Sequence, residues 1–190
     1  VGPNSREVVA AVCDDIDFAA AAFPFMGSRA GRIGDVECRV NRISFSGELA
    51  YEVNVPANYG RFMWEKLMQA GAAHDITPYG TETMHVLRAE KGYVIVGQDT
   101  DGSVTVDDLG LGWAISKTKP DFIGKRSLAR PDTVRKDRKQ LVGLMTKDPH
   151  TVIPAGAQRV NGPQVALPIP MAGHVLCGSV CDRCGHSHSS

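Results

Sequence analysis

The chain has 190 residues, enough for one domain of ordinary size with a smaller addition. Its 21 Lys and Arg residues balance 21 Asp and Glu residues, so it lacks the basic excess that is typical of nucleic-acid-binding proteins. No apolar run approaches the roughly 20 residues that span a bilayer, and no leader of charged and then apolar residues follows Val1. We therefore expect a cytoplasmic protein whose partners are neither nucleic acid nor membrane.

The first elements alternate between helical and strand patterns. Apolar residues at helical spacing predict a short helix over residues 4–12, and Gly31 and Gly34 predict a turn. Residues 36–40 alternate apolar and polar side chains as a half-buried strand does. The phase then slips beyond Asn41 and resumes for a few residues, which indicates a bulge.

The next strand has the cleanest alternation in the chain. Within residues 49–55, Leu49 and every second residue after it are apolar, whereas Glu52 lies on the opposite face. Ser46-Gly47 is placed to close a hairpin in front of this strand, and Pro56 ends it.

Two helices follow. Residues 58–73 carry apolar side chains at the spacing of an amphipathic helix, and residues 75–80 form a turn. Thr81 is a suitable N-cap for a second helix that reaches about Glu90. A short apolar strand is expected over residues 93–96.

The second half of the chain is less regular. Residues 109–115 are a compact apolar stretch, and residues 130–139 are a charged, solvated connector. Residues 140–145 then predict the first strand of a second, mostly β domain. The fold class expected from these elements is α+β.

Standard cofactor motifs fail. Gly110 and Gly112 begin like a dinucleotide fingerprint, but Ile115 stands where the third glycine belongs. Lys119 stands where a P-loop ending at Gly124-Lys125 needs its first glycine. The chain also lacks the HExxH and GxSxG patterns.

Two stretches carry a family resemblance. Residues 42–52 read RISFSGELAYE, close to the form R-x-S-Y-x-G-E-x-G-x-E, and residues 93–113 contain YVIVGQD followed by DDLGLGW. These stretches resemble the glycine-cleavage T-protein family, which includes dimethylglycine dehydrogenase and sarcosine oxidase. The amino-acid sequence of residues 80–113 is most similar to that of the alpha subunits of heterotetrameric sarcosine oxidases, and the resemblance extends from Gly2 to His174.

The resemblance implies a fold and a domain division. Residues 1–129 would form an aminomethyltransferase-type folate-binding domain without its amino-terminal part. Residues 130–175 would begin an incomplete carboxy-terminal β-barrel domain, and residues 176–190 form a divergent tail rich in Cys and His.

The resemblance also implies a function and its partners. Tetrahydrofolate would capture the methylene or formaldehyde unit that is released when sarcosine is oxidised. The beta, gamma and delta subunits of the oxidase would be partners, and FAD or FMN and NAD would bind only elsewhere in the complex.

By resemblance, Glu52 matches the carboxylate that holds the pterin ring of folate. A carboxylate accepts two parallel hydrogen bonds from a ring N–H and a neighbouring NH₂, as it does from arginine. The alternative is an ordinary solvent-facing glutamate. Glu48 shares the expected strand face, but four strand residues separate the two carboxylates by about 13 Å. The spacing excludes an acid–base pair and favours a structural role for Glu48.

The resemblance also assigns other residues to positions that contact folate in the family. Phe45 stands where relatives carry tyrosine, so a ring remains for stacking without the hydroxyl. Trp113 matches a tryptophan that lines folate, with an ordinary core tryptophan as the alternative. Met84 replaces the arginine that meets the folate tail in T-proteins, which makes Lys117 the candidate cation. Arg88 is a candidate for a structural ion pair.

No catalytic residue is expected in this chain. The catalytic aspartate of the family lies upstream of the matched region, and Asp14, Asp15 and Asp17 are typical of a helix end and a loop. The resemblance therefore implies that the chain by itself does not transfer the aminomethyl group.

The tail offers a metal hypothesis. Its three thiols and two imidazoles could in principle ligate zinc: Cys177, Cys181, Cys184, His186 and His188. The alternative is an arbitrary polar tail without the surrounding contacts that orient metal ligands, and we expect no metal.

Three other functions remain open. The first is a free-standing aminomethyltransferase, for which Met84 is unfavourable. The second is a non-catalytic module that binds folate or docks subunits, and the third is a zinc-binding adaptor.

Overall fold

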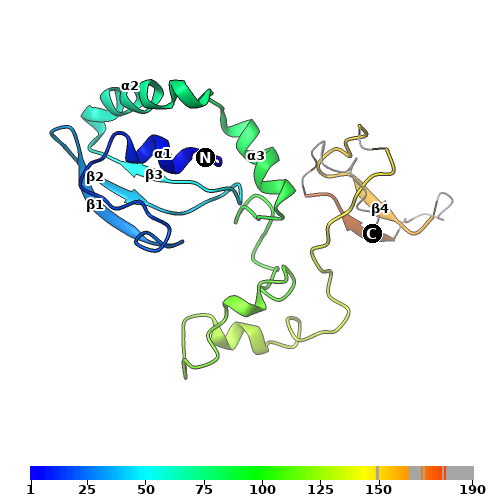
Figure 1. The fold of residues 1–190 in the computed structure, drawn as a ribbon. Helices are drawn as coiled ribbons and strands as arrows, with labels where there is room; N and C mark the ends of the chain where they lie inside the picture. Colours follow the sequence, from blue (N-terminus) through cyan, green and yellow to red (C-terminus); the bar gives the residue numbers. More distant parts are fainter. Residues whose placement is uncertain (149, 163–167, 169, 177, 179–190) are drawn as a thin grey trace, which may run out of the picture. The chain divides into compact units, whose positions relative to one another are not determined.

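The computed structural model describes residues 1–148, 150–162, 168, 170–176 and 178 (Figure 1). The chain divides into two compact units, Val1–Tyr93 and Val94–Ser190. The expected boundary near residue 130 concerns the complete domains of the family and stays a prediction.

The first unit contains an antiparallel three-stranded sheet in the order β1-β2-β3. Its strands are β1 (Ser28–Ile33), β2 (Val36–Asn41) and β3 (Glu52–Asn54). A two-residue turn joins β1 to β2, and its Gly34 has a φ of 58°, in the region that favours glycine. This turn fixes the register, which pairs Ile33 with Val36 and Ser28 with Asn41.

Alternation along β2 decides which face of the sheet is buried. Val36, Cys38 and Val40 are buried, whereas the residues between them are exposed. The buried face packs against α1 (Ser5–Ala10), the segment that follows it, and α2 (Gly60–Gly71), which lie on one side of the sheet in Figure 1. The polar face of the sheet therefore lies opposite the helices.

The strand β1 corrects the prediction of a turn at Gly31. A Cβ atom on Gly31 would lie 2.6 Å from Asp15 Oδ1 and 2.6 Å from Ile16 Cγ1. The absence of a side chain lets the segment after α1 lie directly on the strand. Glycine therefore marks close backbone packing here, and only Gly34 belongs to the turn.

The strand expected over residues 49–55 is shorter than predicted, and the segment before it is irregular. Residues 42–51 form a loop without the predicted bulge or a hairpin at Ser46-Gly47. Arg42 donates to the carbonyl of Phe23 at 2.7 Å, and the Ser5 hydroxyl donates to the carbonyl of Leu49 at 3.1 Å. These bonds to residues outside the sheet compete with strand pairing.

The three predicted helices are confirmed, and α1 is shorter than the predicted range of residues 4–12. The short 3₁₀ helices η1 (Ala57–Tyr59) and η2 (Ala72–His74) flank α2, and Met63 of α2 enters the core. The third helix is α3 (Thr81–Glu90). Its N-cap is Gly80 rather than Thr81, which occupies the first helical position and makes no capping hydrogen bond.

Aromatic residues complete the core of the first unit. The Tyr51 ring meets Phe18 and Phe23 edge-on, with ring centroids 5.6 and 5.8 Å away. The Tyr51 hydroxyl is buried and has no hydrogen-bond partner among the described residues. An unpartnered buried hydroxyl destabilises the fold, so this tyrosine is not optimal for stability.

We expect Tyr51→Phe to raise the free energy of unfolding by about 1 kcal/mol, because it removes the unpartnered hydroxyl and keeps the ring contacts. Urea denaturation of the two proteins measures the difference. Phe18→Leu is a suitable comparison, since it removes ring contacts and should destabilise. A clear loss of stability in Tyr51→Phe would mean that the hydroxyl has a partner.

The second unit is mostly irregular. Residues 93–96 form no strand, because the backbone N–H of Ile95 bonds to the Asp99 carboxylate at 2.8 Å in a turn. The 3₁₀ helices η3 (Gly112–Ala114) and η4 (Lys125–Ala129) follow. A two-stranded antiparallel sheet is formed by β4 (Gln158–Val160) and β5 (Met171–His174).

The strand predicted over residues 140–145 is also wrong. Its side chains are exposed, and the backbone is irregular although Leu141 N–H donates to the carbonyl of Asp108 at 2.7 Å. No neighbouring strand pairs with this segment in the described structure. Helices and small sheets together agree with the mixed α and β content predicted, and the barrel domain stays a prediction.

Among the described residues every helix is too short or too polar to cross a membrane, and α2, the longest of them, has 12 residues.

Candidate functional site

Glu52 begins β3 on the polar face of the sheet and is exposed. Its neighbours Tyr51 and Val53 pack toward the core, as the alternation predicted. Within the described part of the chain, no hydrogen bond or ion pair engages the Glu52 carboxylate. Both of its oxygens are therefore available to a ligand.

A polar row crosses the sheet at the end where Glu52 lies. Glu52 pairs with Asn41 of β2, and Asn41 pairs with Ser28 of β1. Paired residues on antiparallel strands share a face, so the three side chains stand next to one another. The Ser28 hydroxyl lies 2.7 Å from Asn41 Oδ1. We call Ser28, Asn41 and Glu52 the cross-sheet row.

Exposed apolar side chains flank this end of the sheet. Phe25 and Met26 are 58% and 72% exposed in the loop that leads into β1. Met26 has a φ of 66°, which is unusual for a residue with a side chain. Hydrogen bonds of 2.9 Å from Met26 N–H to the Arg42 carbonyl and from Arg42 N–H to the Gly27 carbonyl fix this loop to the end of β2. The loop that carries Phe25 and Met26 therefore lies close to the start of the loop that carries Phe45.

Phe45 lies in that loop and is 38% exposed. Its ring is tilted against that of Tyr93, with centroids 6.3 Å apart. The cross-sheet row and the adjoining Phe25-Met26 loop place polar groups beside apolar side chains, a combination that suits a planar heterocycle. Phe45 lies in the loop that joins β2 to β3.

Glu48 lies in the loop before β3 and has an ion-pair partner of its own. Its carboxylate pairs with Lys91 Nζ at 3.3 Å, and the Lys91 stem covers Gly47, whose φ is 77°. This contact supports the structural role that the spacing predicted for Glu48.

The helix α3 holds the other two family positions of the first unit. Met84 is half-buried. Arg88 is almost completely buried and donates to the carbonyl of Tyr93 at 3.1 Å. Its burial and this bond support the structural role expected for Arg88.

The remaining candidates lie in the second unit. Trp113, in η3, is 79% exposed, which excludes an ordinary core tryptophan in this structure. Lys117 is exposed in the following turn. The structure thus brings Glu52 and Phe45 into one unit and Trp113 and Lys117 into the other.

The second unit is organised by a buried ion pair. Arg138 donates from Nε to both carboxylate oxygens of Asp108, at 2.9 and 3.0 Å, and its side chain is 19% exposed against 7% for Asp108. These bonds, together with one from the Thr105 N–H, lower the pKa of Asp108 from 3.8 to about 2. Arg138 is therefore not part of a fully solvated connector, as residues 130–139 had been predicted to be.

The aspartates after α1 are structural, as expected. Asp15 Oδ1 accepts the Arg32 N–H at 2.9 Å, which is the main reason that the pKa of Asp15 lies below its usual value. Asp17 accepts the Ala19 N–H at 2.8 Å.

The two cysteines of the first unit are inert. Cys13 and Cys38 are buried and not bonded to each other. Burial raises the pKa of the Cys13 thiol to about 12, with a smaller contribution from its bond to Asp15, and burial also raises the pKa of Cys38. Neither thiol is suited to act as a nucleophile.

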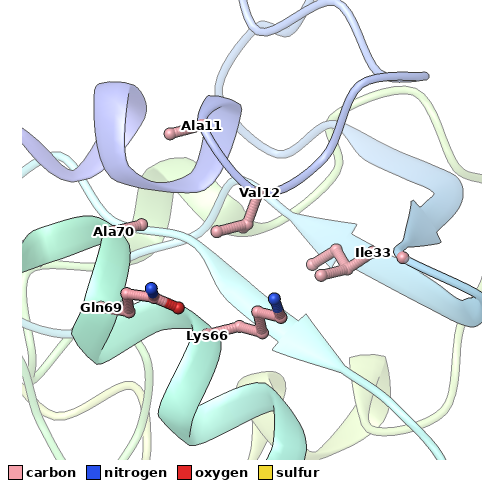
Figure 2. A pocket seen from close by; sticks show the side chains of 7 residues that line it. Ala11, Val12, Ile33, Lys66, Gln69 and Ala70 are labelled. Atoms are coloured by element: carbon pink, nitrogen blue, oxygen red, sulfur yellow. The ribbon is translucent and has the colours of Figure 1, made fainter.

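A hollow of about 350 Å³ lies elsewhere on the first unit (Figure 2). Its lining comes from the end of α1, the β1–β2 turn and α2: Ala11, Val12, Ile33, Gly34, Lys66, Gln69 and Ala70. None of the predicted site residues lines it.

The described residues contain no group of three or more His, Cys, Asp or Glu side chains able to hold a metal ion. The tail hypothesis is not tested, because Cys177, Cys181, Cys184, His186 and His188 lie outside the described residues.

Two of the residues in the cross-sheet row, Ser28 and Asn41, were missed by the sequence reasoning. The signal that could have found them is Gly34-Asp35. A two-residue turn pairs the residues on either side of it, and counting outward pairs Ser28 with Asn41.

Residues 1–119 match the family model of the GCVT N-terminal domain. Since this match covers more than half of the chain, the chain belongs to the GCVT N-terminal domain family. It is similar to sarcosine oxidase subunit alpha of Corynebacterium sp. (strain U-96), with 50% identity over 178 residues, 92% of this chain and 18% of the relative.

Two further relatives show the range of the similarity. Sarcosine oxidase subunit alpha of Rhizobium meliloti (strain 1021) is 42% identical over 158 residues, 82% of this chain and 16% of the relative. An aminomethyltransferase of Halothermothrix orenii is 33% identical over 147 residues, 77% of this chain and 40% of the relative. The resemblance to both kinds of protein is confirmed, and the chain spans less than a fifth of the sarcosine oxidase subunits.

Proposed function

We propose that this chain provides part of the tetrahydrofolate-binding wall of an alpha subunit of the sarcosine oxidase type. Folate would there capture the one-carbon unit from the oxidative demethylation of sarcosine. Membership of the GCVT N-terminal domain family and 50% identity to a sarcosine oxidase subunit alpha support the assignment.

The observation that carries the proposal is the free carboxylate of Glu52 on the polar face of the sheet. It can accept two hydrogen bonds from the edge of a pterin ring. Phe45 would offer a ring for stacking, and Trp113 and Lys117 would contribute further contacts from the second unit. When bound, tetrahydrofolate supplies the amine nitrogen that accepts the one-carbon unit.

Met84 favours an oxidase-type protein over a free-standing aminomethyltransferase. A half-buried thioether cannot form the ion pair that an arginine makes with the folate tail at this position. The beta, gamma and delta subunits would be the partners, and they and the rest of the complex would hold the flavins and NAD.

We expect Glu52→Gln to weaken tetrahydrofolate binding by about 1–3 kcal/mol, because the amide places a donor against a donor on the pterin edge. A folate titration of the full chain measures the affinity. In the assembled enzyme the rate of sarcosine oxidation should stay nearly unchanged.

Glu37→Gln is the matched control. Glu37 is an exposed glutamate on the same sheet face, but it stands at the other end of β2. The Glu37→Gln protein should bind folate with the affinity of the unaltered protein. If Glu52→Gln also leaves the affinity unchanged, Glu52 does not contact folate and the proposal loses its main support.

A further inference from the structure

The edge of a 2-amino-4-oxo pterin carries three groups in a row: an NH₂ donor, a ring N–H donor and a carbonyl acceptor. A carboxylate accepts hydrogen bonds and donates none, so Glu52 can satisfy the first two groups and not the third. A site that recognises the whole edge needs a donor next to Glu52.

We propose that Asn41 is this donor, a second specificity-determining residue that binds the ring carbonyl. The inference rests on the proposed function, since it requires Glu52 to hold the ring. Asn41 and Glu52 are direct partners in the β2–β3 register. Side chains of such partners leave the same face with Cβ atoms about 4.5–5.5 Å apart, which is comparable to the distance between the two outer groups of the pterin edge, the NH₂ and the carbonyl.

Ser28 orients the Asn41 amide. The Ser28 hydroxyl lies 2.7 Å from Asn41 Oδ1 and donates to it. This bond directs the amide NH₂ away from Ser28, toward the Glu52 side of the row. The opposite orientation would place the amide oxygen beside a carboxylate, with two acceptors facing each other. The cross-sheet row therefore presents the two acceptor oxygens of Glu52 and, next to them, the donor NH₂ of Asn41. This order complements the two donors and one acceptor of the pterin edge.

No hydrogen bond in the described part of the chain engages the Asn41 amide nitrogen. The Asn54 amide, on the same face of β3, instead donates to the Arg39 carbonyl at 3.4 Å. Asn54 therefore provides a matched control, an exposed asparagine one row away whose donor already has a backbone partner.

The test compares folic acid with its 4-amino-4-deoxy analogue, which carries a donor where folic acid has the carbonyl. Ligand-observed NMR titration of the full chain suits weak affinities. We expect Asn41→Ala to weaken folic acid binding about tenfold and binding of the analogue less than twofold, since the analogue carries an NH₂ group where the Asn41 amide would meet the carbonyl. Asn54→Ala should change neither affinity.

Ser28 acts through Asn41, so its variants test positioning. Ser28→Ala should weaken folic acid binding about threefold, because the amide loses its orientation, and Ser28→Thr should restore it, because the hydroxyl returns. Equal effects of Ser28→Ala on both ligands would point to a general loss of structure and contradict a positioning role.

The outcomes separate this inference from the proposed function. If Glu52→Gln weakens folic acid binding and Asn41→Ala does not, or if Asn41→Ala weakens both ligands equally, the role of Asn41 is refuted and the proposed function stands. If the unaltered chain does not bind folic acid, or if Glu52→Gln binds as the unaltered chain does, the proposed function fails. Guanosine has the same three-group edge, and tighter binding of guanosine than of folic acid would reassign the row to a nucleoside.

Discussion

Replacing Arg138 by alanine is expected to destabilise the second unit by about 3–5 kcal/mol, because the buried Asp108 carboxylate loses its partner. The guanidinium also donates to the carbonyls of Ser103, at 2.6 Å, and Asp132, at 2.9 Å. One side chain thus joins segments that contain little regular secondary structure. Hydrogen exchange resolved by segment should show the loss of protection over residues 101–141.

Arg135→Ala is the matched control. Arg135 pairs with Asp137 at 2.5 Å, but the two side chains are 61% and 69% exposed. Exposed pairs contribute about 0–1 kcal/mol, so exchange should hardly change. Equal effects of the two substitutions would show that burial does not increase the contribution of the Asp108–Arg138 pair to the stability of the second unit.

The loss of stability at acid pH is an independent test of the contribution of the Asp108–Arg138 pair. The pKa of Asp108 is about 2 in the folded chain, lowered from its ordinary value of 3.8 mainly by the bonds from Arg138. A lower pKa in the folded state means that the stabilisation is complete above the ordinary value and is lost as the pH falls from 3.8 toward 2. The protection of residues 101–141 should follow this curve, and Arg138→Ala should remove most of this acid dependence, because the bonds from Thr105 remain.

Gly31→Val is expected to lower the free energy of unfolding of the first unit by about 3 kcal/mol. Valine favours strands more than glycine does, so propensity alone predicts the opposite sign. The added Cβ would lie 2.6 Å from both Asp15 Oδ1 and Ile16 Cγ1, and Ile16 is buried and cannot move outward. Steric overlap therefore outweighs propensity, and urea denaturation gives the sign directly.

Ala30→Val is its control on the same strand. Ala30 is exposed on the polar face, where added methyl groups meet solvent. Its effect should stay within about 0.5 kcal/mol. A neutral Gly31→Val would mean that the segment around Asp15 does not rest on the sheet.

The sequence predicted the elements whose signals are local. The alternation of β2 and the apolar stripe of α2 each fall within one segment, and both elements formed as expected. The strand β1 was missed because Gly31 looked like part of a turn, although its role is close packing against a segment 15 residues earlier. Sequence spacing contains no information on such distant contacts.

Contacts between residues distant in the sequence also explain why the roles of Arg138, Asn41 and Ser28 were not predicted. Arg138 looks solvated in a run of charged residues, and its partner Asp108 lies 30 residues away. Glu52 was placed on the polar face because strand alternation is local. Its neighbours Asn41 and Ser28 required the register of three strands, which depends on β1.

Asp15 also limits how far another chain could extend the sheet. β1 is an edge strand, and the backbone groups of Arg32 that point away from β2 would be available for pairing with an added strand. The Asp15 carboxylate already occupies the Arg32 N–H, and the charged side chains of Arg29 and Arg32 lie along the same strand. One carboxylate thus makes β1 a poor template for intermolecular β-pairing near the turn, so that a strand added to β1 would have to pair at its Ser28 end.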